Sequence, residues 1–408
     1  MKIRPFNGLR PKEGLAKDIA SLPYDVVDFK QACEQAEGKP LSFMRVVRSE
    51  LELPEGTDPY SDQVYEHAYE NFKKLVDNSY LVREGEKVMY LYRQVMGDHA
   101  QTGLVATFSA QDYDSDVIKK HEKTRQAKEN DRYRLTRRLR VNTGPVFLTV
   151  KDGTKLDKII EDKKDSDALF DFVADDGIRH TVWKISDPEK LAEIEKIFEA
   201  IPCAYVADGH HRSASNARCA RDLAAENKNH TGDEDYNWFL SVVFPAGQLK
   251  ILPYNRVVKD LAGLSEGEFL AQLKKVCELC ESGEKEPKGS REVCMYLGGK
   301  WYTLKFANAE SLDAVESLDV SLLQNRVLAP LLKIGDPRTD ERIDFVGGIK
   351  GVKELERLVD SGAFKVAFSM YPTTVKQLMD IADAGQIMPP KSTWFEPKLR
   401  SGLFVHTF

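Results

Sequence analysis

The sequence predicts a mixed α/β fold of more than one domain, on three observations. Strand-like and helix-like apolar patterns alternate along most of the chain, as they do in α/β and α+β proteins. The length of 408 residues allows about two to four domains. Hydrophobic residues make up 42% and charged residues 30% of the chain, which provides for buried cores and excludes a generally disordered or collagen-like protein.

The predicted elements follow from apolar periodicity. In residues 58–78, Val64, Ala68, Phe72 and Leu75 recur every three or four positions and form one apolar face of a helix. The other predicted helices are 189–200, 264–281, 318–332, 351–361 and 373–384, besides one that begins after residue 209 and runs to about residue 226. The predicted strands are 87–95 paired with 102–108, then 146–150, 181–185, 204–208, 238–244, 249–252, 293–297, 301–306 and 364–369.

The predicted domain division follows the changes in these patterns. Residues 1–95, which begin with short elements between prolines, form the expected N-terminal α+β domain. Residues 96–255 form a central core with a polar insertion near 151–200. Residues 256–408 form a C-terminal α/β region that closes the site described below.

Charge and composition exclude several classes of protein. Lys and Arg total 59 against 65 Asp and Glu, so the net charge is −6, which disfavours a dedicated nucleic-acid binder. No apolar run reaches the roughly 18 residues of a membrane-spanning helix, and the first residues lack the apolar core of a signal peptide, so we expect a cytoplasmic protein that does not bind membranes. The six cysteines are expected to be reduced thiols; Cys277 and Cys280 lie three residues apart in a predicted helix and are not expected to bind a metal.

Residues 119–140 are strongly basic. They contain ten Lys or Arg and three acidic residues, a local net charge of +7. Within this stretch His121 precedes Glu122, a carboxylate that surrounding cations would keep ionised and able to accept a proton. The alternative is a solvent-facing helix with ion pairs four residues apart.

The sharpest local feature is the sequence Asp-Gly-His-His-Arg at 208–212, where a predicted strand runs into a predicted helix. A helix N-terminus presents unpaired N–H groups to an anion, and Gly209 lets a ligand approach the backbone. Arg212 can bind a phosphate with two hydrogen bonds, and His210 and His211 can donate to its oxygens or move protons. Asp208 can hold Mg²⁺. The alternative is that Asp208 only caps the helix and the histidines only pack.

A third feature lies near the C-terminus, where two prolines are followed by Lys391, Ser392 and Thr393. A point charge and two hydroxyl donors in a row suit an anionic group. The alternative is a tail docked by Trp394 and Phe395.

Together these segments resemble a known family. Residues 205–215, YVADGHHRSAS, are similar to the phosphate-binding turn of the ParB/sulfiredoxin-like fold, and closest to the VDGHHR turn of its free serine kinases. Those kinases also carry a His-Glu pair upstream and a PKTT segment near the end, matched here by His121-Glu122 and by the segment 390–393. The whole chain resembles an uncharacterised bacterial and archaeal family with a PYDV segment, here at 23–26.

The resemblance implies a fold and an activity. The fold is a ParB/sulfiredoxin-like nucleotide-binding core with an additional N-terminal α+β domain and a C-terminal α/β extension. The activity is a nucleotide-dependent kinase that phosphorylates a metabolite hydroxyl, with free L-serine as the favoured acceptor and with ATP or ADP and Mg²⁺ as cofactors. The resemblance leaves the phosphate donor, the acceptor and the oligomeric state open.

The matched positions carry implied roles. Glu122 would be the base, with Asp208 and His210 assisting catalysis and Asp208 binding the metal. The nucleotide phosphates would be bound by Gly209, His210, His211 and Arg212, and the acceptor by His121, Lys391, Ser392 and Thr393.

This sequence also departs from the kinases, and one other function stays open. The kinases follow PKTT with Arg-His, where this chain has Trp394-Phe395. Asp208 lies 86 positions after Glu122, a longer separation than in the kinases, which requires an insertion in this chain. A nucleotide-responsive ParB-like regulatory or DNA-binding protein is the alternative function, supported by the basic stretch. A sulfiredoxin-like reductase is disfavoured, because its turn needs a cysteine. Two further polar segments, Tyr24-Asp25 and 336–342, either line the site or form structural ion pairs, and we favour ion pairs.

Overall fold

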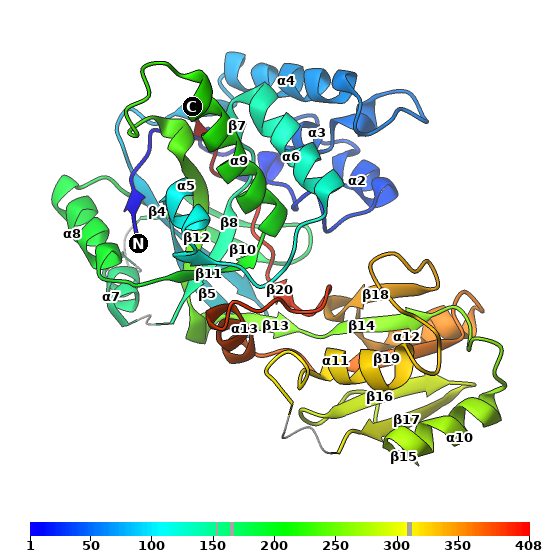
Figure 1. The fold of residues 1–408 in the computed structure, drawn as a ribbon. Helices are drawn as coiled ribbons and strands as arrows, with labels where there is room; N and C mark the ends of the chain where they lie inside the picture. The colour runs from blue at the N-terminus through cyan, green and yellow to red at the C-terminus, as the bar shows by residue number, and fades with distance from the viewer. Residues whose placement is uncertain (152–153, 164–166, 308–311) are drawn as a thin grey trace. The chain divides into compact units, whose positions relative to one another are not determined.

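The protein folds as a mixed α/β structure, as the alternating patterns predict (Figure 1). The computed structural model describes residues 1–151, 154–163, 167–307 and 312–408. The chain forms two compact units. The first unit comprises Met1–Lys120, Thr124–Leu249 and Pro397–Phe408, and the second comprises His121–Lys123 and Lys250–Glu396. The division into three domains at residues 95 and 255 is not tested by these two units and stays a prediction.

A nine-stranded sheet forms the centre of the first unit. Its path is β6 (Ile118–Lys119), β11 (Ala204–Asp208), β8 (Val146–Val150), β12 (Trp238–Pro245), β5 (His99–Ser109), β4 (Met89–Met96), β10 (Arg179–Ile185) and β9 (Phe170–Val173), and β1 (Ile3–Arg4) pairs with β5. The pairs β11–β6 and β12–β8 are parallel and the other pairs of this sheet are antiparallel. The predicted pairing of 87–95 with 102–108 is confirmed by β4 and β5.

Helices cover one face of this sheet and bury its apolar side chains. Leu104, Val146 and Phe239 of the sheet belong to one core with Phe198 of α8 and Ala217 of α9. The helices that contribute to this core are α5 (Ala110–Asp114), α7 (Thr154–Lys163), α8 (Pro188–Glu199) and α9 (His210–Glu226). Of the predicted insertion 151–200, residues 152–153 and 164–166 lie outside the described part of the chain.

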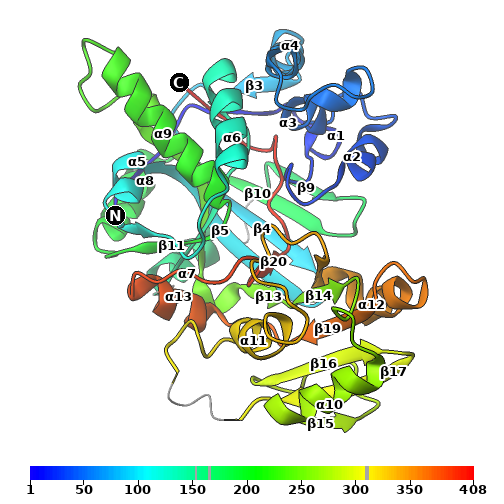
Figure 2. The ribbon, with the colours of Figure 1, turned by 45° about the vertical axis from the view of Figure 1, so that its right-hand side comes forward.

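A second core of the first unit is built from the N-terminal elements. These are β2 (Leu9–Pro11), α1 (Ala16–Ile19), α2 (Phe29–Ala36), α3 (Met44–Val47), a 3₁₀ helix (Ser49–Glu52), α4 (Asp62–Asp77) and β3 (Leu81–Arg83). The predicted helix 58–78 is confirmed as α4, which buries Val64, Ala68, Phe72 and Leu75. Helix α6 (Gln126–Leu139) packs against both α4 and α9, and Figure 2 shows it between them.

The end of the chain belongs to the first unit. The strand β21 (His406–Thr407) pairs with β7 (Val141–Asn142), and the bridges Leu9–Val405 and Ser21–Ser401 hold the tail against the N-terminal elements. Leu403, Phe404 and Val405 are at most 1% exposed. The last twelve residues are therefore part of the core, because burial of these side chains removes a large apolar area from water.

The second unit has its own antiparallel sheet. Its order is β15 (Glu278–Glu281), β17 (Lys300–Lys305), β16 (Glu292–Leu297), β19 (Val366–Met370), β14 (Tyr254–Val258) and β18 (Ile343–Gly347). Its helices are α10 (Glu266–Val276), α11 (Asp319–Leu323) continued by a π-helix (Gln324–Leu328), α12 (Gly351–Asp360) and α13 (Val375–Asp383). Leu355 of α12 packs on Val257, Cys294 and Trp301 of the sheet. The ends of the unit's main segment meet where β13 (Lys250–Leu252) pairs with β20 (Trp394–Glu396).

One predicted helix is too long. The prediction gave 264–281, but α10 ends at Val276 and residues 278–281 form the edge strand β15, which pairs with β17. Cys280 therefore lies on a strand and not on a helix. All six cysteines are free thiols.

No helix in the described ranges is long and apolar enough to span a bilayer.

We predict that the tail contributes strongly to the stability of the first unit. Phe404 is 1% exposed and its ring lies 5.0 Å from that of Tyr90, so Phe404→Ala is expected to lower the free energy of unfolding by about 3–5 kcal/mol in urea titrations. The same change at Phe29, which is 51% exposed, should alter it by less than about 0.5 kcal/mol. Equal effects of the two substitutions would contradict a docked tail.

Candidate functional site

The predicted turn lies where β11 ends at Asp208 and α9 begins at His210. Gly209 joins them with φ +94°, a conformation that side chains with a Cβ rarely adopt. A Cβ at this position would also lie 3.1 Å from the guanidinium of Arg212, which folds back over the glycine. The turn therefore needs glycine for two reasons, its backbone conformation and the close approach of Arg212.

Arg212 holds the turn together and keeps one donor unused. The side chain is 8% exposed, and one terminal nitrogen donates to the carbonyl of Pro145. Its Nε is buried and has no hydrogen-bond partner within the described chain. A buried polar group without a partner costs about 1–3 kcal/mol, so an acceptor that binds here would remove that cost.

Asp208 is paired with a residue that the sequence analysis did not select. Lys398 of the tail places Nζ 3.2 Å from Asp208 Oδ2, and the N–H of Gly209 donates to Asp208 Oδ1 at 2.8 Å. Burial alone would raise the pKa of the Asp208 carboxyl, but Lys398 and Arg212 hold that pKa well below its usual range. The carboxylate is therefore ionised, and any metal at Asp208 would have to compete with an ammonium group.

The position of Lys398 is fixed from the sheet. Gln94 of β4 donates its side-chain N–H to the carbonyl of Lys398 at 2.8 Å, and Gln101 of β5 donates to Gln94. Lys398 follows the segment 390–393 by five residues, and only the tertiary structure indicates that it, and not Lys391, pairs with Asp208.

The two histidines of the turn have different surroundings. His210 is 6% exposed, and burial, aided by His211 and Arg212 and opposed by Asp208, lowers its pKa to about 4. Its imidazole is therefore neutral near pH 7. His211 accepts a hydrogen bond at Nε2 from the N–H of Arg125, at 3.0 Å, so in this arrangement its proton is on Nδ1.

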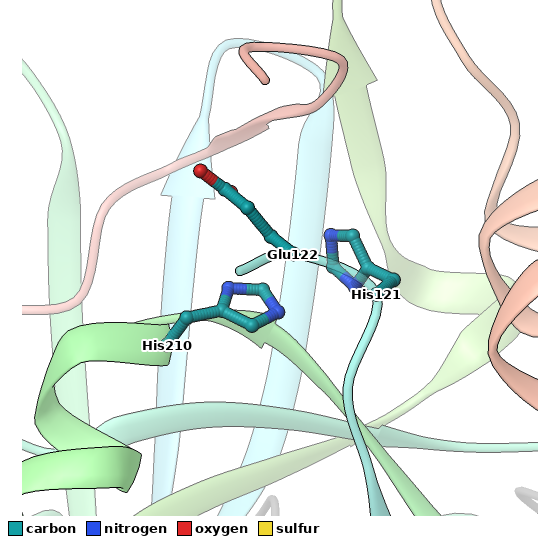
Figure 3. Close-up of side chains that lie close together, drawn as sticks. All are labelled: His121, Glu122 and His210. Atoms are coloured by element: carbon teal, nitrogen blue, oxygen red, sulfur yellow. The ribbon is translucent and has the colours of Figure 1, made fainter. Parts of the chain in front are cut away.

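His121 and Glu122 lie in a loop, not in a helix. Helix α6 begins only at Gln126, so the alternative of a solvent-facing helix at 120–125 is wrong. Figure 3 shows both side chains on this loop and His210 at the start of α9. His121 is buried and Glu122 is half-buried.

The loop is anchored on both sides to elements of the first unit that adjoin the turn. On one side Lys119 of β6 pairs with Tyr205 of β11, and on the other Arg125 bonds to His211. Glu122 is three residues from each anchor.

Tyr24 places a second unused donor in the first unit. Its hydroxyl is buried without a hydrogen-bond partner in the described residues, and the guanidinium of Arg132 lies 3.8 Å from its ring centre. Arg48 fixes the backbone by donating to the carbonyls of Tyr24 and Val27. Burial and Asp25 raise the pKa of the Tyr24 phenol far above its usual range, and Arg132 and Arg212 oppose that rise. The phenol therefore lies in the field of the arginine of the turn and keeps its proton.

The predicted acceptor residues lie in the second unit and differ in what they offer. Lys391 has φ +58° and carries its ammonium 5.3 Å from the ring centre of Tyr254. The hydroxyl of Ser392 donates to the carbonyl of Pro389 at 2.6 Å, so its proton is already used. Thr393 is half-buried, and its hydroxyl has no hydrogen bond among the described residues.

The polar segment 336–342 behaves as a structural element. Arg338 pairs with Asp336 at 2.8 Å, and Arg342 pairs with Asp340 at 2.9 Å and with Asp260 at 3.2 Å. Arg342 also donates to the carbonyls of two residues in the preceding loop. The favoured expectation of ion pairs is confirmed for this segment.

The structure thus brings five predicted residues together in one turn of the first unit and places the others in the second. The turn holds Asp208, Gly209, His210, His211 and Arg212, and the second unit holds His121, Glu122, Lys391, Ser392 and Thr393. The sequence analysis missed Lys398 as a partner of Asp208.

The chain belongs to the family described as "Protein of unknown function (DUF1015)", which matches residues 3–321. This confirms the expected membership of an uncharacterised family. No curated protein matches the chain.

Several solved structures are similar to the chain at low identity. A free serine kinase variant in complex with ADP is 14% identical over 73% of this chain and 91% of the kinase, with a TM-score of 0.36. A conserved hypothetical protein from Pyrococcus furiosus is 15% identical over 73% of this chain and 95% of that one, with a TM-score of 0.36. SbnI with a C-terminal truncation, from Staphylococcus aureus, is 11% identical over 72% and 82%, with a TM-score of 0.36. The expected similarity to free serine kinases is therefore found, but scores of this size leave the function to be argued from the residues.

We predict a pH-dependent contribution of the Asp208–Lys398 pair to stability. Lys398→Met removes the ammonium from a largely buried carboxylate and should lower the free energy of unfolding by about 1–3 kcal/mol near pH 7. Because the folded-state pKa of Asp208 lies below its unfolded value of about 3.9, the pair stabilises above about pH 4 and this contribution is lost as the pH falls further.

Urea titrations at several pH values measure this effect. The difference between wild type and variant should shrink as the pH falls from about 7 towards about 3. Lys376→Met, at an 83% exposed lysine paired with Asp380, is the control and should have little effect at any pH. A difference that is constant with pH would contradict an ion pair.

Proposed function

We propose that this protein is a nucleotide-dependent phosphotransferase that binds nucleotide phosphates at the turn 208–212, with a small metabolite hydroxyl, L-serine in the first place, as acceptor. Residues 96–255 would be the ParB/sulfiredoxin-like nucleotide-binding core of this enzyme. The observation that carries the proposal is the buried guanidinium of Arg212, folded over Gly209 with its Nε unpaired at the start of a 17-residue helix.

The turn offers several donors to one anion. The first bond of α9 runs from the N–H of Ser213 to the carbonyl of Gly209, so the N–H groups of His210, His211 and Arg212 precede the hydrogen-bonded helix. The helix dipole adds partial positive charge at this end. Arg212 supplies the fixed positive charge, and a neutral His210 can donate one hydrogen bond without a proton-transfer cost. This set suits the phosphate groups of ATP or ADP.

Glu122 is the proposed base. In the transfer, the acceptor hydroxyl oxygen forms a bond to the terminal phosphorus, and the bond from that phosphorus to the bridging oxygen breaks. The shortened nucleotide leaves with the electron pair, and the hydroxyl proton passes to Glu122. Support comes from the anchoring of its loop at Lys119 and Arg125, beside β11 and the turn. His121, Lys391 and Thr393 would bind the acceptor, whereas Ser392 would act mainly by holding the loop shape.

Mg²⁺ would supply charge neutralisation between phosphate oxygens. Asp208 is the proposed ligand from the sequence, but its two oxygens face the N–H of Gly209 and the ammonium of Lys398. The residues present thus fit a lysine-neutralised carboxylate better than a metal ligand, and no step above depends on the ion.

The charges on α6 weaken the alternative of DNA binding. Its arginines are paired with acidic residues of the same unit: Arg132 with Asp131, Arg134 with Asp62, Arg137 with Glu226 and Arg138 with Glu66. A phosphate backbone would have to displace these partners, so the local charge of +7 overstates what is available to a nucleic acid.

We predict that Glu122→Gln abolishes turnover and retains nucleotide binding. With Mg²⁺, ATP or ADP, and a panel of hydroxyl-bearing metabolites including L-serine, wild-type protein should form a phosphorylated product, read by mass. The variant should lose about 10²–10⁴-fold in rate, because the proton acceptor is gone. Glu66→Gln, at an exposed carboxylate on α4, should keep full rate. Full turnover by Glu122→Gln would refute the base, and no product with any acceptor would refute the kinase.

We predict that Tyr24→Phe separates binding from stability. Because the hydroxyl has no partner in the free protein, its removal should leave the free energy of unfolding unchanged or higher. If this hydroxyl donates to a bound phosphate, the affinity for ADP should fall about 5–10-fold in calorimetry. Tyr80→Phe, at a 36% exposed tyrosine, should change neither quantity. Unchanged ADP affinity in Tyr24→Phe would remove Tyr24 from the phosphate site.

A further inference from the structure

Arg256 is a buried cation in the sheet of the second unit. It lies on β14, paired with Phe368 of β19 and Phe345 of β18, and is 4% exposed. Its guanidinium lies 5.5 Å from the ring centre of Phe345. An arginine in the interior of a sheet is costly unless something compensates its charge.

Its neighbours in the protein are carbonyl groups and not carboxylates. One terminal nitrogen donates to the carbonyl of Tyr254 and the other to that of Lys391, the latter at 3.0 Å. Among the described residues no carboxylate pairs with it, and burial lowers its pKa to about 10, so it stays protonated at neutral pH. Only two of the five N–H groups that a guanidinium carries have protein acceptors in the described chain.

Two other buried arginines show what compensation looks like. Arg132 and Arg400 are 7% and 3% exposed, and each is paired with an aspartate, Asp131 and Asp176. Arg256 has no such partner in the ranges that the structure describes. Burying this charge costs desolvation energy. An apolar residue could fill the same place in the sheet without that cost, so a structural role alone does not explain the arginine.

Arg256 contacts the segment 390–393, which the sequence analysis proposed as an anion site. The carbonyl that it holds is that of Lys391, whose positive φ turns the chain at this point. Lys391 adds a second cation over Tyr254, and Thr393 adds a half-buried hydroxyl.

Aromatic rings form a wall next to these groups. Trp394 meets Tyr254 edge to face with ring centres 5.0 Å apart, and Tyr254 meets Phe345 in the same way at 5.9 Å. Trp394 lies directly on Gly347, where a Cβ would come within 2.8 Å of the indole. Such a low-dielectric wall strengthens a charge interaction with a ligand.

We infer that Arg256, with Lys391, binds the carboxylate of an amino-acid or hydroxy-acid ligand in the second unit. The planar fork of a guanidinium matches a carboxylate with two parallel hydrogen bonds, and the unused N–H groups supply the donors. The inference rests on the proposed function in that this ligand is the acceptor. It specifies the acceptor as an acid bearing a hydroxyl group rather than an uncharged alcohol.

Calorimetry with the full-length protein tests the inference without any turnover. L-serine and ethanolamine share the hydroxyl and the amine and differ by the carboxylate, and inorganic phosphate serves as the probe for the other oxyanion. Wild-type protein should bind L-serine about 10–100-fold more tightly than ethanolamine, because a charge-assisted pair contributes that much. Arg256→Gln should lose this preference, while its ADP affinity stays unchanged and Arg357→Gln, at an exposed arginine paired with Glu354, behaves as wild type.

The outcomes are separable from those of the kinase assay. A preference for L-serine without turnover would support carboxylate binding by Arg256 and refute the kinase activity. Turnover without this preference would support the kinase activity and refute carboxylate binding by Arg256. Tighter binding of phosphate than of L-serine would overturn the assignment to a carboxylate. Should Arg256→Gln fail to fold, Lys391→Gln tests the same point on a loop. A wild-type protein without the preference, or a Lys391→Gln variant that keeps it in full, would overturn the inference.

Discussion

The ion pair between Asp208 and Lys398 is the interaction on which the candidate phosphate site depends. It joins the end of β11 to a tail that is 190 positions away in sequence. It also lets Asp208 remain ionised beside the turn that we propose as the phosphate site. Without a cation at this place, the carboxylate would repel a phosphate ligand and its burial would favour the protonated form.

Arg212 and Arg256 are both buried cations with N–H groups that have no acceptor in the described residues, but their surroundings differ. Arg212 is held by a hydrogen bond to the carbonyl of Pro145 and by its position over Gly209. This position leaves its Nε without an acceptor in the described residues. Arg256 is held by hydrogen bonds to two carbonyls, which do not neutralise its positive charge. Each is preorganised, and a ligand that meets either of them has little ordering of the side chain left to do.

The turn was predictable from sequence because its signals are local. An apolar strand, a glycine and an amphipathic helix follow one another within residues 204–226, and local sequence dictates each of them. Lys398 was not predictable, since Lys391 lies only seven residues before it and only the docking of the tail shows which of the two pairs with Asp208. The burial of Arg256 had no clear signal, because β14 reads Tyr-Asn-Arg-Val-Val and the polar residues in it do not show which side chains face the interior.

The errors of the sequence analysis have the same physical origin. Residues 278–281 carry a pattern compatible with a helix, but pairing with β17 makes them a strand. The helical alternative for the loop at Glu122 failed because α6 starts late, at Gln126. Tertiary context overrides weak local preference in both places.

The docked tail also has a consequence for the order of synthesis. A ribosome releases β11 and α9 long before residue 398, so the nascent turn is completed only after the second unit has emerged. Closing so long a loop carries an entropic cost that local elements do not have. The turn of this protein therefore obtains its charge partner only after residues 250–396 have been synthesised, and a chain interrupted before Lys398 would hold the turn's sequence without its charge balance.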